Sequence, residues 1–219
     1  TLLSCCQLAK IKKIITSRRF LERARLDLSD LEQAGIELIY LEDVRTGITT
    51  KSKLSALIRQ KFTRPFQSTP IDPESVAAIL FTSGSEGIPK GVELTHANLM
   101  ANIRQMLSVI DLTDQDRVFN ALPMFHSFGL TIGTLLPLVR GIFIYLYPSP
   151  LHYRMVPALV YDQDCTIVLG TNTFLNGYAR KAHIYDFQTV RYLFAGAEKT
   201  QASTFETWAN KFGIRILGA

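Results

Sequence analysis

Short apolar runs alternate along this chain with segments in which apolar residues recur at helical spacing. The runs predict strands, and helical spacing together with capping residues predicts helices. The predicted strands cover residues 11–15, 36–41, 76–80, 91–94, 117–122, 142–147, 166–169, 190–194 and 213–217. The predicted helices cover residues 16–24, 29–35, 51–62, 95–109, 128–139, 155–161, 171–179 and 200–212. Because such alternation builds parallel sheets with helices on their faces, we predict an α/β fold of layered, largely parallel sheets flanked by helices.

Capping residues and prolines add boundaries to this pattern. Ser29, followed three residues later by Glu32, has the pattern of a capping box, and Gly35 then ends that helix. A connector that contains several prolines precedes the third predicted strand. We therefore predict an incomplete domain with a first α/β portion at residues 1–70 and a second portion at residues 71–219, which carries the candidate site.

The composition is that of a globular protein with a core. Of 219 residues, 47% are hydrophobic and 20% are charged, and the formal net charge is +5. The chain is therefore not disordered, and it is only mildly basic. Its three cysteines have neither disulfide-framework nor zinc-site spacing, which favours a reducing compartment. Since no apolar run approaches the roughly 18 residues of a membrane-spanning helix, we expect a cytoplasmic protein.

The segment from Phe81 to Gly91 has the chemistry of a phosphate-binding loop. It follows an uncharged run that predicts a buried strand, and it combines glycines, hydroxyls and a lysine. Glycines allow backbone N–H groups to approach an anion, hydroxyls donate hydrogen bonds, and a lysine adds a mobile positive charge. The candidate contacts are Thr82, Ser83, Gly84, Ser85, Gly87 and Lys90.

Two similar motifs do not fit this segment. A Walker loop has Ser or Thr after its Gly-Lys pair and opens into a helix, whereas Pro89 precedes Lys90 and a strand is predicted next. A nucleophile elbow would require glycine at the position of Ser83. A surface turn rich in small residues is the plain structural alternative.

The whole segment resembles the signature loop of the adenylate-forming superfamily, which includes acyl-CoA synthetases, luciferases and peptide-synthetase adenylation domains. Ser85-Glu86 is most similar to the acyl-acyl-carrier-protein (acyl-ACP) synthetases, some of which are bifunctional enzymes that also carry a 2-acylglycerophosphoethanolamine acyltransferase. The resemblance implies that Thr82, Ser83, Ser85 and Lys90 hold the β- and γ-phosphates of ATP.

A second motif, Pro123 to Leu130, contains His126. A lone histidine among apolar residues is more often packed than catalytic. In the superfamily, however, the matching histidine orients the carboxylate to be activated and gates its pocket. The resemblance therefore implies a catalytic and substrate-binding role for His126.

Residues 118–139 contain no Asp, Glu, Lys or Arg. A buried helix and strand explain this, and the same residues could also line a tunnel for an acyl chain, since each buried methylene contributes about 0.8 kcal/mol. Small residues facing a pocket would leave room for the chain. The candidates are Phe128, Gly129, Leu130 and Gly133.

Gly196, Ala197 and Glu198 follow a predicted strand. By itself this segment is a simple turn. The matching turn of the superfamily backs the adenine and the acyl pocket, so the resemblance implies that these three residues contact the nucleotide.

Basic residues gather near the start of the chain, with only Glu22 opposing them. They predict either a solvated helix face or a landing patch for an acidic partner such as acyl carrier protein or an anionic membrane. The cluster comprises Lys10, Lys12, Lys13, Arg18, Arg19, Arg23 and Arg25.

The resemblance extends over the whole chain but covers only part of a synthetase. Further family elements, an aromatic-Gly-x-Thr-Glu motif whose Glu holds Mg²⁺ and a C-terminal lid domain with the adenylating lysine, would follow residue 219. We therefore expect an N-terminal portion that is inactive alone and assign no metal ligand within it. The parent enzyme is expected to use ATP and Mg²⁺ to convert a fatty acid to acyl-AMP and transfer it to acyl carrier protein, in the cytoplasm or at the cytoplasmic face of the inner membrane.

Three alternatives stay open. The parent could be a fatty acyl-CoA ligase or another adenylating enzyme, or the chain could be a non-catalytic nucleotide-binding module. The third alternative is a nucleic-acid binder, which the positive charge suggests. We expect no nucleic-acid partner, because the sequence lacks aromatic–basic interleaving and any groove-reading helix motif.

Overall fold

The computed structural model describes residues 2–62, 70–83 and 89–218. The chain divides into two compact units, Thr1–His96 and Ala97–Ala219. This boundary lies after the third and fourth strands instead of at the predicted connector near residue 70. The fourth strand contacts the first helix, which places both strands with the first unit.

The first unit contains two small sheets and five helices within its described residues. Strands β1 and β2 pair in parallel, and β3 and β4 form an antiparallel hairpin. In chain order its elements are α1 (Leu2–Leu8), β1 (Lys13–Thr16), α2 (Arg18–Ala24), α3 (Ser29–Gln33), β2 (Glu37–Tyr40), α4 (Leu41–Thr46), α5 (Thr50–Phe62), β3 (Val76–Ser83) and β4 (Pro89–Thr95). Helices α1 and α4 were not predicted, because both are short and their sequences have no clear apolar period.

Two helix starts in the first unit are capped differently, and the predicted capping box at Ser29 is wrong. The Ser17 side chain accepts a hydrogen bond from the N–H of Phe20 and so caps α2. Ser29, in contrast, is the first residue of α3 instead of its cap, and Leu28 occupies the cap position without a side-chain hydrogen bond. The carboxylate of Asp27 accepts the N–H of Ser29 at 2.9 Å, which satisfies the group that the predicted capping box would have used.

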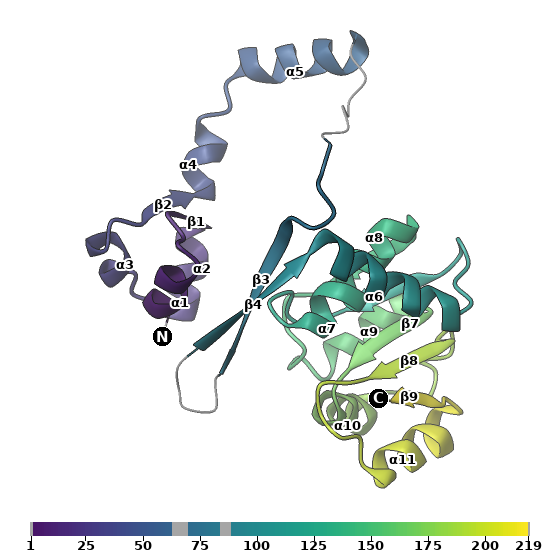
Figure 1. Ribbon diagram of the computed structural model, residues 1–219. Coiled ribbons are helices and arrows are strands. Elements are labelled where there is room, and N and C mark those ends of the chain that lie inside the picture. Colours follow the sequence, from purple (N-terminus) through teal and green to yellow (C-terminus); the bar gives the residue numbers. More distant parts are fainter. Residues whose placement is uncertain (1, 63–69, 84–88, 219) are drawn as a thin grey trace. The chain divides into compact units, whose positions relative to one another are not determined.

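The second unit is a five-stranded, entirely parallel sheet with helices on both faces (Figure 1). This confirms the predicted α/β class. Its strand order is β6-β5-β7-β8-β9. In chain order its elements are α6 (His96–Val109), β5 (Arg117–Asn120), α7 (Ser127–Leu130), the π-helical turn η1 (Thr131–Leu135), α8 (Leu136–Arg140), β6 (Phe143–Leu146), α9 (Met155–Asp162), β7 (Ile167–Gly170), α10 (Asn172–Lys181), β8 (Tyr192–Ala195), α11 (Ala202–Phe212) and β9 (Ile216–Gly218).

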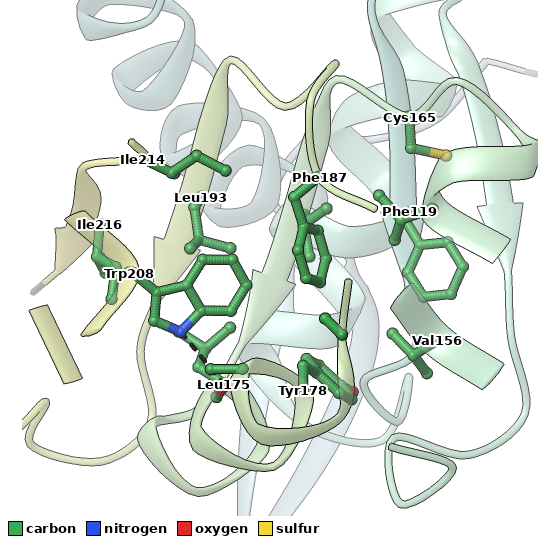
Figure 2. Packing of buried hydrophobic residues seen from close by; sticks show 14 of the residues in the cluster. Phe119, Val156, Cys165, Leu175, Tyr178, Phe187, Leu193, Trp208, Ile214 and Ile216 are labelled. Atoms are coloured by element: carbon green, nitrogen blue, oxygen red, sulfur yellow. Dashed lines mark hydrogen bonds between the residues drawn. The ribbon is translucent and has the colours of Figure 1, made fainter. Parts of the chain in front are cut away.

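Successive residues of each strand point to opposite faces of this sheet, and each face has its own core. Phe119 packs into a cluster with residues of α9, α10 and α11, whereas its neighbour Val118 packs into a cluster with residues of α6, η1 and α8. Figure 2 shows the first cluster, in which Trp208, Tyr178 and Phe187 are at most 1% exposed. The two-sided burial explains why the strands read as continuous apolar runs instead of alternating ones.

The chain reverses its direction of sheet growth next to β5. From β5 it crosses to β6 on one side, and it then returns to β7 on the other side. In open α/β sheets, ligands bind beyond the carboxyl ends of the strands at such a switch point. The segments that follow Asn120, Gly170 and Ala195 therefore lie where a substrate is expected.

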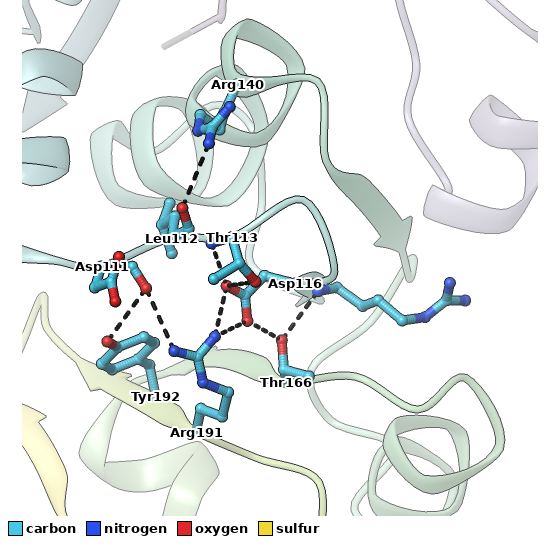
Figure 3. A network of polar contacts seen from close by, with 9 residues as sticks. Asp111, Leu112, Thr113, Asp116, Arg140, Thr166, Arg191 and Tyr192 are labelled. Atoms are coloured by element: carbon cyan, nitrogen blue, oxygen red, sulfur yellow. Dashed lines mark hydrogen bonds and ion pairs between the residues drawn. The ribbon is translucent and has the colours of Figure 1, made fainter.

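The opposite, amino edge of the sheet is held by a buried carboxylate (Figure 3). Asp116, which is 1% exposed, precedes β5 and accepts two hydrogen bonds from Arg191, which precedes β8, each at 2.8 Å. It also accepts the hydroxyl of Thr166, which precedes β7, at 2.7 Å. The carboxylate of Asp116 thus connects the residues that precede β5, β7 and β8.

The basic residues near the start of the chain are paired more than the sequence predicted. Arg18 makes a two-pronged ion pair with Asp43 at 2.7 Å, and Lys13 pairs with Glu37 at 2.8 Å. The expectation that only Glu22 opposes this cluster is wrong, because folding brings in carboxylates from β2 and α4. Among the helices that the structure describes, none combines the length and apolar character needed to cross a bilayer.

Candidate active site

The β3–β4 hairpin carries the predicted phosphate-binding segment. Thr82 is the cross-strand partner of Lys90, and Ser83 is the partner of Pro89. The predicted strands on both sides of the segment are present, and the strand at Lys90 separates it from a Walker loop, which would continue into a helix. Two details are corrected: β3 extends to Ser83, so residues 81–83 belong to a strand instead of a loop, and β3 is not buried.

The exposure of β3 follows from its sheet. Only two strands pair in this sheet, so few neighbouring residues cover β3. The described residues of β3 range from half-buried to exposed, and Val76 is 47% exposed. Directly opposed residues of an antiparallel pair place their side chains on the same face. The hydroxyl of Thr82 and the ammonium of Lys90 can therefore contact one anion. The candidates Gly84, Ser85 and Gly87 lie outside the described residues, as does the side chain of Ser83.

Lys90 also borders a hollow within the first unit. The hollow has a volume of about 570 Å³ and is lined by Lys10, Phe81 and Glu93 as well as Lys90. Lys10 has a left-handed backbone, with φ of 53°. The hollow thus has residues of both charges at its edge, Lys10 and Lys90 as well as Glu93.

His126 lies in the segment that connects β5 to α7, at the carboxyl edge of the parallel sheet. It is exposed and has an extended backbone, with φ of −103° and ψ of 142°. Its N–H donates to the carbonyl of Pro123 at 3.2 Å, and its own carbonyl accepts from the N–H of Leu130 at 2.8 Å. Its ring centroid lies 4.7 Å from that of Phe125. The imidazole is thus held by backbone contacts and reaches solvent at the position where a substrate is expected.

Phe128 and Gly196, which were predicted separately as acyl-pocket and nucleotide residues, are neighbours in the fold. A Cβ atom on Gly196 would lie 3.2 to 3.5 Å from three ring atoms of Phe128. The ring of Phe128 thus packs on the backbone of Gly196 and connects the segments that follow β5 and β8. Leu130, two residues after Phe128 in α7, is partly buried.

Gly129 and Gly133 were predicted to leave room for an acyl chain, and the geometry does not support that reasoning. A Cβ on Gly129 would lie 2.3 Å from the carbonyl oxygen of Pro123, and one on Gly133 would lie 2.5 Å from Nδ2 of Asn120. Protein atoms therefore fill the space on that side of both residues. Their small size permits close packing of the helical segment against the end of β5.

The turn of Ala197 and Glu198 is held by the start of α10. The Glu198 carboxylate accepts the N–H of Thr173 at 2.7 Å and its hydroxyl at 3.1 Å. Hydrogen bonds from Thr171 and Thr173 lower the pKa of Glu198. The carboxylate thus pairs with an N–H group that the helix itself leaves unpaired, and the nucleotide contact of this turn stays a prediction. Ala197 adopts a left-handed conformation, with φ of 67°.

The sequence reasoning missed Asn120 and Thr134. Asn120 is 1% exposed at the last position of β5 and bonds to Thr134 of η1. An asparagine at the end of an otherwise apolar strand was the available signal, since asparagine is depleted in strands and its buried amide requires partners.

The candidate residues thus fall into two groups. Thr82 and Lys90 belong to the first unit. The second unit brings together, at the carboxyl edge of its sheet, the segments that carry His126, Phe128 and the turn at Gly196.

Similarity to known proteins agrees with this arrangement. The family model described as AMP-binding enzyme matches residues 2–219. A long-chain-fatty-acid–CoA ligase of Escherichia coli O6:H1 is 29% identical over 179 residues, which are 78% of this chain and 31% of that protein. A chloroplastic long-chain-fatty-acid–acyl-carrier-protein ligase of Arabidopsis thaliana is 34% identical over 115 residues, which are 51% of this chain and 15% of that protein. The chain thus spans less than a third of the length of these two relatives.

Solved structures share the fold. The crystal structure of ATP-bound MatB from Rhodopseudomonas palustris superimposes with a TM-score of 0.73 and 22% sequence identity, and the match covers 99% of this chain and 41% of that protein. This chain therefore shares its fold with part of a protein whose structure contains ATP. Because the family model spans essentially its whole length, the chain belongs to the AMP-binding enzyme family.

Proposed function

We propose that the protein containing this chain uses ATP to activate a fatty acid as acyl-AMP and transfers the acyl group to the thiol of acyl carrier protein. The observation that carries the proposal is the position of the exposed His126 at the switch point of the parallel sheet, in a chain of this family. Both named relatives are ligases of long-chain fatty acids.

The first step joins two anions. An oxygen of the fatty-acid carboxylate bonds to the α-phosphorus of ATP, and the bond from that phosphorus to the bridging oxygen breaks, so that pyrophosphate leaves with the electron pair. Such a reaction requires positive charge and fixed donors near the phosphates. Lys90 and Thr82, side by side on one face of the hairpin, can hold the pyrophosphate portion. When bound, Mg²⁺ would add charge neutralisation, and no residue of this chain is proposed as its ligand.

His126 would orient the attacking carboxylate. Its ring is exposed, and its backbone is held by hydrogen bonds on both sides, so the imidazole can meet a substrate with little loss of freedom. In the second step the acceptor thiolate attacks the acyl carbon, AMP leaves, and the thiol proton passes to solvent.

A fatty chain suits the surroundings of His126. The neighbouring side chains of Met124 and Phe125 are 52% and 70% exposed, and both line a hollow of about 750 Å³ with Leu146. Residues 118–139 add no charge to this edge of the sheet. An apolar substrate would remove these side chains from water.

The acceptor thiol is proposed from the sequence resemblance. Ser85-Glu86 favours acyl carrier protein by resemblance, whereas the E. coli relative is a CoA ligase. CoA is therefore the second candidate acceptor. Supplying the parent enzyme with acyl-AMP and either thiol separates the two, because the proposal expects thioester formation with carrier protein and little with CoA.

Fatty-acid-dependent exchange of pyrophosphate into ATP by the parent enzyme tests the first step. We expect Lys90→Ala to lower the exchange rate by about 100-fold or more, since it removes a charge that meets the leaving group. Lys53→Ala, on the exposed helix α5, removes the same charge elsewhere and is the matched control. Unimpaired exchange in Lys90→Ala would refute the assigned role of this hairpin.

A further inference from the structure

Asn120 joins the end of β5 to the helical segment that follows it. Its side-chain oxygen accepts the N–H of Leu122 at 2.9 Å. Its amide nitrogen donates to the carbonyl of Gly129 and to the hydroxyl of Thr134, both at 3.3 Å. The Thr134 hydroxyl also donates to the Gly129 carbonyl, at 2.8 Å. One buried amide thus holds both ends of the segment that contains His126.

The helical segment is shaped around this amide. The absent side chain of Gly133 provides the space, since any Cβ there would lie 2.5 Å from Nδ2 of Asn120. The turn η1, which contains Gly133 and Thr134, is π-helical. Single π-helical turns inside helices are frequent at functional sites, where they change the pairing of backbone carbonyls.

Burial contributes little to the position of the residues beside His126. Met124 and Phe125 are more than half exposed, and His126 itself is exposed. Their place at the edge of the sheet therefore depends on the hydrogen bonds at the ends of the segment. Those bonds are made by a side chain that is 1% exposed, where they are not weakened by competition from water.

We propose that Asn120 is a positioning residue for the carboxylate-binding side of the active site: its amide fixes residues 121–130 and so places His126 and Phe128. The inference rests on the proposed function for what these two side chains do. It extends that function by naming a group that touches neither substrate nor phosphate.

The position requires an amide, because one group must accept and donate at once. An apolar residue would leave the N–H of Leu122 without its acceptor, and the bonds to Gly129 and Thr134 would be lost. Aspartate has the same shape but no donors when ionised, and it would bring negative charge against the Gly129 carbonyl oxygen. Asn120→Asp therefore isolates the donor function. Thr134→Val, which keeps the size of the side chain and removes one hydroxyl, is a milder second variant.

The first test measures position without any ligand, by hydrogen exchange of this chain. We expect the amides of residues 121–130 to exchange about tenfold faster in Asn120→Asp, and in the same direction but less in Thr134→Val, because their opening becomes easier. Thr166→Val is the matched control: it removes a partly buried hydroxyl bond at the opposite edge of the sheet. The inference is overturned if both variants accelerate exchange evenly across the second unit, or leave residues 121–130 unchanged.

The second test uses the parent enzyme. Misplacement of His126 should raise the KM for fatty acid or lower kcat by about tenfold in Asn120→Asp, while the KM for ATP stays within about twofold of its original value. Equal changes for both substrates, or the same pattern in Thr166→Val, would indicate a structural role only. If the wild-type enzyme shows no fatty-acid-dependent exchange of pyrophosphate into ATP, the proposed function is refuted. The hydrogen-exchange measurement would still decide whether Asn120 positions residues 121–130.

Discussion

The Glu198 carboxylate accepts both the backbone N–H and the hydroxyl of Thr173, at 2.7 and 3.1 Å. The two residues lie 25 positions apart, one after β8 and the other in the first turn of α10. A negative charge at the start of a helix pairs favourably with its unbonded N–H groups and its dipole. This contact anchors the turn that places Gly196 against Phe128.

We expect Glu198→Ala to destabilise the chain by about 1 kcal/mol, as the loss of a helix cap does. Since the pKa of Glu198 is lowered by folding, its stabilisation is present above its ordinary pKa and is lost as pH falls through the folded value. Denaturant unfolding of wild type and variant should therefore differ at neutral pH and converge in acid. Glu206→Ala, on the exposed side of α11, provides the charge control. A difference that persists unchanged at low pH would contradict this account.

Ala197→Gly should stabilise the chain. A residue with a Cβ at φ of 67° costs roughly 1 kcal/mol, which glycine does not pay. Thermal unfolding would measure the change, with Ala209→Gly in the middle of α11 as a control that loses stability. Equal destabilisation by both substitutions would show that the turn is not strained in solution.

Gly133→Ala distinguishes close packing from an open acyl tunnel. The new methyl would collide with Asn120, so we expect a loss of about 1 to 3 kcal/mol in unfolding free energy. If the glycine instead faced open space, alanine would be tolerated and would only shorten the accepted chain. Gly47→Ala, whose nearest atoms are 3.4 Å away, should be close to neutral.

Asp116 should carry part of the acid sensitivity of the fold (Figure 3). Its burial opposes ionisation, but hydrogen bonds from Thr113, Thr166 and Arg191 outweigh that effect and lower its pKa. Its contribution is therefore present above the ordinary pKa of aspartate, about 3.9, and lost as pH falls toward the folded value.

Asp116→Asn should accordingly cost about 2 kcal/mol at neutral pH, as the loss of charged hydrogen bonds in a buried site does, and less in acid. Urea titrations at several pH values would show this. Asp114→Asn removes the same charge from a side chain that is 81% exposed and should have little effect. A pH-independent loss in Asp116→Asn would mean that charge is not the source of its stabilisation.

Much of the architecture followed from the sequence. The apolar runs placed every strand of the parallel sheet, because strands that helices cover on both faces are rich in apolar residues. The two strands that flank the candidate phosphate-binding segment were also predictable, since their apolar runs are local features of the sequence. The capping box at Ser29 was wrong because Asp27 competes for the same N–H group.

Other features could not be predicted in this way. The sequence suggested that Gly129 and Gly133 left room for an acyl chain and that Glu22 alone opposed the basic residues. Both interpretations depended on a partner that is distant in sequence: Asn120 for Gly133 and Asp43 for Arg18. The bond between Glu198 and Thr173 is likewise not visible in the sequence.

The sequence by itself thus determined most of the elements, their order and the α/β class, because hydrophobic periodicity and backbone propensity act over a few residues. Only the tertiary structure decided which polar groups meet. Asp116 and Arg191 are 75 residues apart and are joined because parallel strands align their starts at one edge of the sheet. Hydrogen bonds depend on such spatial contacts, and residue order encodes them only through the completed fold.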